Sequence, residues 1–273
     1  MLAALQFDFM QNALLSGILV SVACGIVGTL VVVNRIVFIS GGIAHAAYGG
    51  IGLAFYLGVP PSFGAAFFSV FSSMVMGVVS LKNKERADTI IGVIWAIGMA
   101  IGIILIDLTP GYNVDLMSYL FGSILSVPDR DIWFMLFLDI LIFLLVWFFY
   151  KELLAMSYDE EFSFTVGIPI KFLYFTLLGM IALSVVMIIQ VVGLIMVIAL
   201  LTIPPFIAEK YTLSLAKMMI LSSLLGILFT TTGLWLSYTY NLTSGATIIM
   251  VAGCVFFISF GMDFFKGYLR RDI

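Results

Sequence analysis

The only histidine of this 273-residue chain, His45, lies in the stretch FISGGIAHAAYGGIG, residues 38–52. Neutral imidazole is a good ligand for zinc, manganese and iron, so His45 could contact a divalent metal ion. If the stretch crosses a membrane from Arg35, ten residues of helix place His45 about 15 Å deep in an apolar core about 30 Å thick. An ionisable group there is costly, which makes it a functional candidate. Two roles stay open: transient contact with a passing metal ion, or a hydrogen bond across a tightly packed helix pair.

Glycine dominates the helical face that His45 would occupy. Positions three, four and seven residues apart share one face of a helix. Because glycine has no side chain, another backbone or a cavity can come very close to that face. We therefore expect four residues to shape the surroundings of the histidine: Gly41, Gly42, Gly49 and Gly52.

Three aspartates are further candidates for contact with a cation. Asp139 stands inside an otherwise uncharged run, where it could act in transport, take part in a cross-helix hydrogen bond or be partly protonated. Its helical neighbours are bulky, so the sequence implies no cavity beside it. Asp107 and Asp115 lie in the polar connection 107–131, where they could attract cations to an outer mouth or be ordinary solvated loop charges.

The sequence argues against an enzyme and against a nucleic-acid-binding protein. It contains neither GxxxxGK[ST] for nucleotide phosphates nor HExxH for a catalytic zinc. Ser40 and His45 are five residues apart on one predicted helix and point about 140° apart, so they cannot form a catalytic dyad. The net charge of −3 and the absence of basic stripes make nucleic acid an unsuitable partner.

The elements that must position these residues are membrane helices. The chain is 63% hydrophobic and only 10% charged, whereas soluble domains carry about 25% charged residues. Since a spanning helix needs about 20 apolar residues, the uncharged runs predict nine spans, with a hairpin near Gln190 between two of them. The fold class is therefore an all-α polytopic membrane protein with 8–9 transmembrane helices, in a single domain over residues 1–273. The runs are 12–34, 36–81, 89–106, 132–150, 172–208 and 218–262.

Lysine and arginine predict the orientation of these spans in a cell membrane. Basic residues favour cytoplasmic loops, and threading nine spans places all the basic loops on one side. The C-terminus is then cytoplasmic and the N-terminus lies on the opposite side. The basic residues used are Arg35, Lys82, Lys84, Arg86, Lys151, Lys171, Lys210, Lys217, Lys266, Arg270 and Arg271.

The longest cytoplasmic connection, residues 151–171, is the most suitable place for a soluble partner. Acidic residues followed by alternating apolar ones predict a short amphipathic helix that ends at Gly167 and Pro169. The residues that we expect at this docking segment are Asp159, Glu160, Glu161, Phe162 and Gly167.

Several blocks, in order, resemble the permease subunits of zinc, manganese and iron ATP-binding-cassette importers. They include LVVVNRIVFISGGIAHAAYGGIGLAFYLG, ADTIIGVIWAIGMAIGIILI, YDEEFSFTVGIP and VVGLIMVIALLTIPPFIAEKYT, and the likeness covers about residues 5–260. The resemblance implies a permease like those of type II importers, which forms a homodimer, binds two cytoplasmic ATPase subunits and receives its metal from an extracytoplasmic binding protein. It also implies that residues 157–169 contain the helix that couples to the ATPase.

The chain departs from that family at one position beside the histidine. The family's block reads roughly G-D-A-L-S-H-A, with an aspartate four residues before the histidine. Here SGGIAHA keeps His45 but has Gly41 at the carboxylate position. A second ligand from another helix, weaker contacts with the ion, or a different substrate would each be consistent with this change.

Together these features predict the membrane permease of an ATP-driven importer for zinc or manganese, or for iron, with no permanently bound cofactor and the metal as cargo. The alternative is a secondary transporter or channel that works without an ATPase on a cation or small solute. Copurification of a nucleotide-binding subunit would favour the importer, and proton-coupled transport by the lone chain would favour the alternative.

Overall fold

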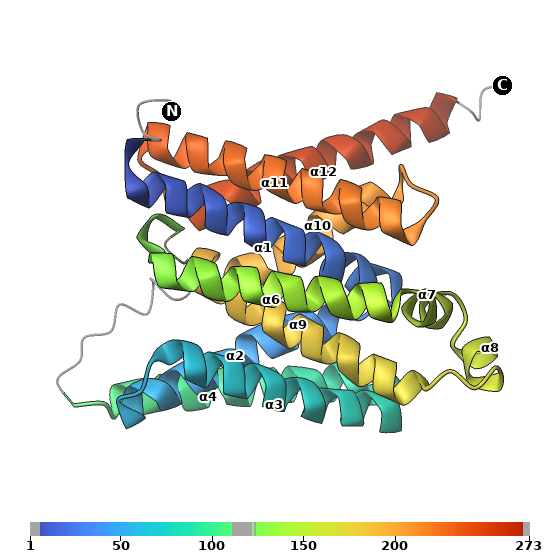
Figure 1. The fold of residues 1–273 in the computed structure, drawn as a ribbon, viewed down its shortest axis with the longest axis horizontal. Coiled ribbons are helices and arrows are strands. Elements are labelled where there is room, and N and C mark those ends of the chain that lie inside the picture. The colour runs from blue at the N-terminus through green and yellow to red at the C-terminus, as the bar shows by residue number, and fades with distance from the viewer. Residues whose placement is uncertain (1–5, 111–121, 123, 270–273) are drawn as a thin grey trace.

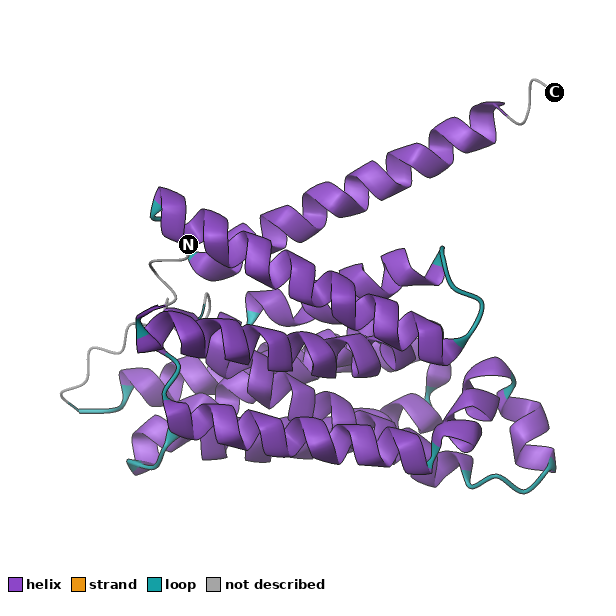
Figure 2. Cartoon of the chain, turned by 45° about the horizontal axis from the view of Figure 1, so that its top comes forward, coloured by secondary structure: helices purple, strands orange, loops and turns teal. Residues whose placement is uncertain are grey.

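The computed structural model describes residues 6–110, 122 and 124–269, and within these residues all regular structure is helical (Figures 1 and 2). In the described part of the chain, eight helices are long and apolar enough to cross a membrane, and α10, which stands where a ninth span was predicted, is a shorter apolar helix. This confirms the predicted all-α polytopic fold. The helices are α1 (Asp8–Val33), α2 (Val37–Leu57), α3 (Pro61–Lys82), α4 (Ala87–Asp107), α6 (Asp129–Phe148), α7 (Tyr150–Tyr158), α8 (Glu160–Thr165), α9 (Ile170–Val192), α10 (Ile195–Glu209), α11 (Leu215–Tyr240) and α12 (Ser244–Leu269), with 3-10 turns at Lys84–Arg86 and Ile124–Ser126.

Local sequence signals explain where several helices begin and end. Gly58 takes a left-handed φ of +67° after α2, and Pro61 starts α3, where its missing N–H removes no helical hydrogen bond. Gly193 has a φ of +77° and separates α9 from α10. The hairpin predicted near Gln190 is therefore real, and its turn lies between Val192 and Ile195.

The α9–α10 turn is buried within the protein. Val192 and Leu194 on either side of Gly193 are 2% and 0% exposed, and the backbone near Gly193 approaches Gly122 closely. With 15 residues, α10 is about 22 Å long, shorter than the apolar core of a membrane. A turn placed below the surface accounts for this length.

The helices form two groups joined by α9 (Figure 1). In one group α2 packs against both α3 and α4, and in the other α1 packs against α10 and α11, with α12 beside them. Helix α9 contacts α3 in the first group and α1 in the second, while α6 packs on α1. The histidine helix thus belongs to the α2–α3–α4 group.

The connections rich in lysine and arginine lie at one end of the helix bundle. The α1–α2, α3–α4, α6–α9 and α10–α11 connections are at the right in Figure 1, whereas the α2–α3 and α11–α12 connections are at the left. This agrees with the prediction that the basic loops share one side. We call the end with α7 and α8 the basic end.

Glycines allow the closest helix contacts in the α2 group. A Cβ atom at Gly49 would lie 2.8 Å from the carbonyl oxygen of Gly98 on α4 and 3.0 Å from Cε1 of Phe68 on α3. At Gly52 it would clash with the backbone of Gly102. Small residues permit such backbone contacts. In lipid, where the hydrophobic effect does not drive helices together, the van der Waals energy of these contacts stabilises the helix pair.

We expect Gly49→Ala to lower the stability of the purified protein by about 1–3 kcal/mol, because α2 must move away from α4. Thermal unfolding in detergent measures this change. The matched control is Gly179→Ala in α9, where an added Cβ meets nothing within 4 Å and better helix propensity keeps or raises stability. Equal stability of the two variants would contradict the packing argument.

Candidate translocation site

His45 lies midway along α2 and packs on a tryptophan of α4. Its ring stacks on Trp95, with the ring centroids 4.0 Å apart and the planes 11° apart. Within the described residues, Nδ1 of His45 is buried and has no hydrogen-bond partner. The ring is thus held against α4 by stacking, and this nitrogen is not used in a cross-helix hydrogen bond.

The four glycines around His45 face three different helices. An added Cβ at Gly41 would meet Ile198 of α10 at 3.0 Å, and at Gly42 it would meet Ile91 of α4 at 2.5 Å. Gly49 and Gly52 meet the backbone of α4, as described above. The expected close approach of another backbone therefore occurs at the latter two, whereas the role of all four in shaping a translocation path stays a prediction.

Asp139 is buried on α6, which packs on α1, α7 and α9. It is 8% exposed, and neither carboxylate oxygen has a hydrogen-bond partner among the described residues. The carboxylate is near enough to Cys24 of α1 to interact with it electrostatically. The structure therefore provides no cross-helix hydrogen bond for Asp139, and its surroundings differ from those of His45, which faces α4.

The other predicted cation contacts do not assemble into a site. Asp107 is exposed at the last position of α4, and Asp115 lies outside the described residues. No group of three or more histidine, cysteine, aspartate or glutamate side chains in the described part of the chain could hold a metal ion. The described part of a single chain therefore has no closed metal site around His45, whose contact with a metal ion stays a prediction.

The predicted docking segment forms α7 and α8 at the basic end. Asp159 caps α8, and its Oδ1 accepts a hydrogen bond of 2.8 Å from the backbone N–H of Phe162. Glu160 and Glu161 occupy the first turn, where negative charge favours the helix dipole. Gly167 has a φ of +88° just after the helix, which confirms the predicted end of α8.

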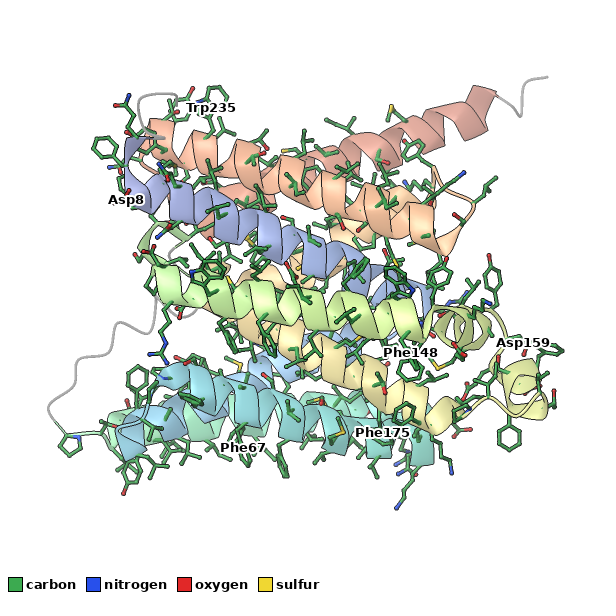
Figure 3. The ribbon with its side chains drawn as sticks, viewed as in Figure 1. Asp8, Phe67, Phe148, Asp159, Phe175 and Trp235 are labelled. Carbon is green, nitrogen blue, oxygen red and sulfur yellow. The ribbon has the colours of Figure 1, made fainter. Side chains whose placement is uncertain are left out.

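The apolar side chains of α8 and of Val166, which follows it, are exposed. Phe162 is 63% exposed, Phe164 73% and Val166 62%, beside the acidic residues of the first turn. Figure 3 shows Asp159 at the far end of the protein, beyond Phe148 of α6. Exposed aromatic residues outside the long helices are typical of a surface that binds another protein.

Comparison with known proteins identifies the family. The sequence model of the ABC 3 transport family matches residues 6–263.

The chain belongs to the ABC 3 transport family.

Named relatives support this membership over nearly the whole length. An uncharacterized membrane protein of Synechocystis is 55% identical, over 95% of this chain and 92% of its own. The manganese transport system membrane protein MntC of Listeria monocytogenes is 34% identical, over 94% of this chain and 91% of its own. A chain of the structure of PsaBC from Streptococcus pneumoniae in complex with Fab superposes with a TM-score of 0.85 at 34% identity, covering 95% of this chain and 94% of that one.

Membership of the ABC 3 family confirms several sequence-based expectations. The resemblance to ATP-binding-cassette metal permeases is correct, and so is the expectation of a membrane permease without catalytic activity of its own. The alternative without an ATPase is disfavoured, because the family is an ABC transport family.

Sequence reasoning did not single out Trp95, the residue that holds the His45 ring, nor Ile198, which covers Gly41. Trp95 is on α4, 50 residues from His45 along the chain, and no spacing rule within one helix could connect them. Both residues lie in the blocks that carry the family resemblance. A tryptophan midway along an apolar helix was the only available signal.

We expect Gly41→Asp to fold, because its nearest neighbour is the flexible tip of Ile198. Gly42→Asp is the control and should lower thermal stability, since its Cβ meets the branched Ile91 at 2.5 Å. In Gly41→Asp the new carboxylate stands one helical turn from His45 and adds a second possible metal ligand. The affinity of this variant for Mn²⁺ or Zn²⁺, measured by calorimetry on the purified protein, should therefore rise about tenfold. Equal instability of both variants, or an unchanged metal affinity, would contradict this prediction.

Proposed function

We propose that this chain is the membrane-spanning permease of an ATP-driven importer for a divalent transition metal, with manganese the first candidate and zinc or iron the others. The observation that carries this proposal is the match to the manganese transport system membrane protein MntC over 94% of the chain. The metal is cargo, and no permanently bound cofactor is part of the proposal. A metal ligand midway along α2 is consistent with transient contact during passage.

Three partners complete the proposed transporter. A second copy of the chain and the first copy together form the translocation path, and the α2 helices of both copies line it. A cytoplasmic ATPase subunit binds α8 on each copy, and an extracytoplasmic binding protein delivers the metal at the opposite end. The basic end is then cytoplasmic, together with the C-terminus, in agreement with the distribution of lysine and arginine.

The proposed transport cycle uses α8 as the connection between ATP and the path. ATP binding by the partner moves α8 relative to the membrane helices, and the two groups of helices change their relative position. Because α2 lies in one group and α10 in the other, the contact between Gly41 and Ile198 is at the boundary. This movement would expose His45 first to one side and then to the other.

Elemental analysis of cells that carry this chain with its partner genes tests the proposal. We expect deletion of the chain to reduce accumulation of one metal among manganese, zinc and iron, and His45→Ala to reduce the same metal to the level of the deletion. The control is Cys254→Ala, which removes a side chain that is exposed on α12.

The outcomes of this experiment distinguish the proposed role of His45 from the proposed importer function of the whole chain. Normal uptake by His45→Ala alone would make the histidine a packing residue and direct attention to Asp139. If no metal changes in the deletion strain, the importer proposal itself is wrong.

We further expect Phe162→Ala combined with Phe164→Ala to reduce copurification of the ATPase at least about tenfold, because exposed aromatic anchors supply most of the affinity in such interfaces. Membrane levels of the permease should be unchanged, since both rings are outside the helix bundle. The matched control is Tyr240→Ala, which removes a ring that is 68% exposed at the opposite end of the bundle. ATPase binding at the wild-type level would show that α8 is not the docking site.

A further inference from the structure

Helix α7 connects the docking helix α8 to the membrane helices in an unusually direct way. A single residue, Phe149, separates α7 from α6, and a single residue, Asp159, separates it from α8. Two side chains of α7, Leu153 and Met156, are buried against the bundle. A displacement of α8 therefore acts on α7 with almost no flexible chain between them.

One end of α7 is hydrogen-bonded to the start of α11. The backbone N–H of Ala216, in the first turn of α11, donates to the hydroxyl of Tyr150 at 3.1 Å. The first four N–H groups of a helix have no partner within that helix, so this contact satisfies a group that is otherwise left to solvent. Tyr150 and Ala216 are 66 residues apart in the sequence.

The other end of α7 is hydrogen-bonded to the end of α1. The side-chain amide of Asn34 donates to the hydroxyl of Ser157 at 2.9 Å and to the carbonyl of Leu30 at 2.8 Å. The Ser157 hydroxyl in turn donates to the carbonyl of Leu153 at 2.8 Å. A continuous chain of hydrogen bonds thus runs from the last turn of α1 to the last turn of α7.

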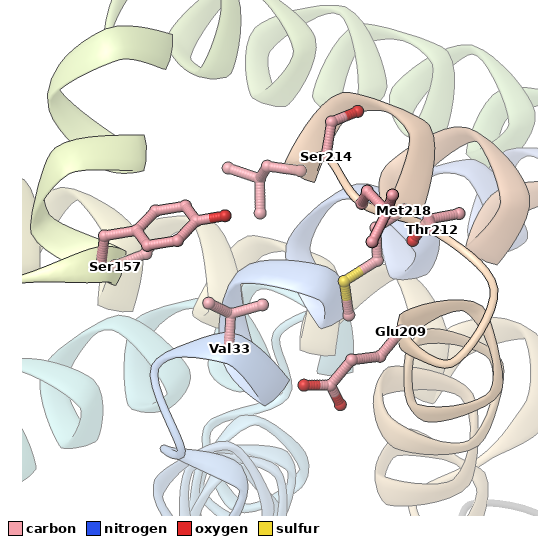
Figure 4. Close-up of a pocket in the computed structure, with 9 residues that line it drawn as sticks. Val33, Ser157, Glu209, Thr212, Ser214 and Met218 are labelled. Atoms are coloured by element: carbon pink, nitrogen blue, oxygen red, sulfur yellow. The ribbon is translucent and has the colours of Figure 1, made fainter.

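A cavity of about 320 Å³ lies beside the second of these contacts (Figure 4). It is bordered by the ends of α1, α7 and α10 and by the start of α11, and it is partly open to the protein surface. The empty space beside Ser157 lets the end of α7 shift there without a steric clash. Its lining includes Val33, Ser157, Glu209, Thr212, Ser214 and Met218.

We infer that α7 transmits the movement of α8 to α1 and α11, through the Ser157–Asn34 and Tyr150–Ala216 hydrogen bonds, and that the cavity is the space into which α7 moves. This inference rests on the proposed function, because it requires an ATPase that moves α8. Helices α1 and α11 belong to the group that packs on α10, and α10 meets the histidine helix at Gly41. Three positioning residues thereby couple ATP hydrolysis to the change of access in the translocation path: Tyr150, Ser157 and Asn34.

The ratio of ATP hydrolysed to metal transported tests this inference in proteoliposomes that contain the whole complex with its ATPase. Tyr150→Phe and Ser157→Ala each remove one hydroxyl that joins α7 to another helix. We expect each to raise the ratio about fivefold, because hydrolysis continues while the loss of about 1 kcal/mol makes the coupled arrangement less populated by that factor. ATPase copurification should stay at the wild-type level, and the free energy of unfolding should fall by no more than about 1 kcal/mol.

Thr239→Val is the matched control, because it removes a hydroxyl that donates only within its own helix, to the carbonyl of Trp235 at 2.8 Å. An unchanged ratio in both α7 variants would overturn the inference, as would a proportional fall of transport and ATP hydrolysis with lower thermal stability. If no ATPase copurifies with the wild-type chain, the proposed function fails and this inference fails with it.

Discussion

The close approach of the α2 and α4 backbones is the contact on which the candidate site depends. In lipid the hydrophobic effect does not drive helices together, so association relies on van der Waals contact and on small residues that permit it. Gly49 and Gly52 of α2 meet Gly98 and Gly102 of α4 with no space for a Cβ atom. This contact fixes the distance and rotation of the two helices, and it brings the His45 ring flat against Trp95 one turn away.

Polar groups within the bundle follow two different patterns. Most buried hydroxyls donate to a carbonyl three or four residues earlier on the same helix, which satisfies them without a partner helix. The Ser21 and Thr230 hydroxyls are 3.0 Å apart and connect α1 with α11. Nδ1 of His45 and both oxygens of Asp139 lack such partners among the described residues, and unsatisfied buried groups are costly. The hydroxyl groups of Ser69, Ser163, Tyr174 and Ser222 share this state, so the roles of His45 and Asp139 stay predictions.

The middle of the protein and its basic end are held together by different kinds of contact. In the middle, tight glycine contacts keep each group of helices together as a unit. At the basic end, α8 is joined to the bundle through the short helix α7, which packs by Leu153 and Met156 and makes single hydrogen bonds to α1 and α11. A cavity lies beside this helix. A tightly packed group of helices resists deformation and therefore moves as one body. The hydrogen bonds between α7 and the bundle can break during such a movement, because each contributes only about 1 kcal/mol.

The sequence by itself determined the helical class, the positions of the spans, the common end of the basic loops and the end of α8 at Gly167, because hydropathy, charge and turn residues act within one segment. It also identified His45 and the glycines on its helical face. Only the tertiary structure decided that Trp95 covers His45, that Gly41 faces α10, that Asp139 lies on a helix packed against α1, and that α7 is bonded to both α1 and α11. These facts depend on the rotation of each helix about its own axis, which the packing of all the other helices sets and no local pattern encodes.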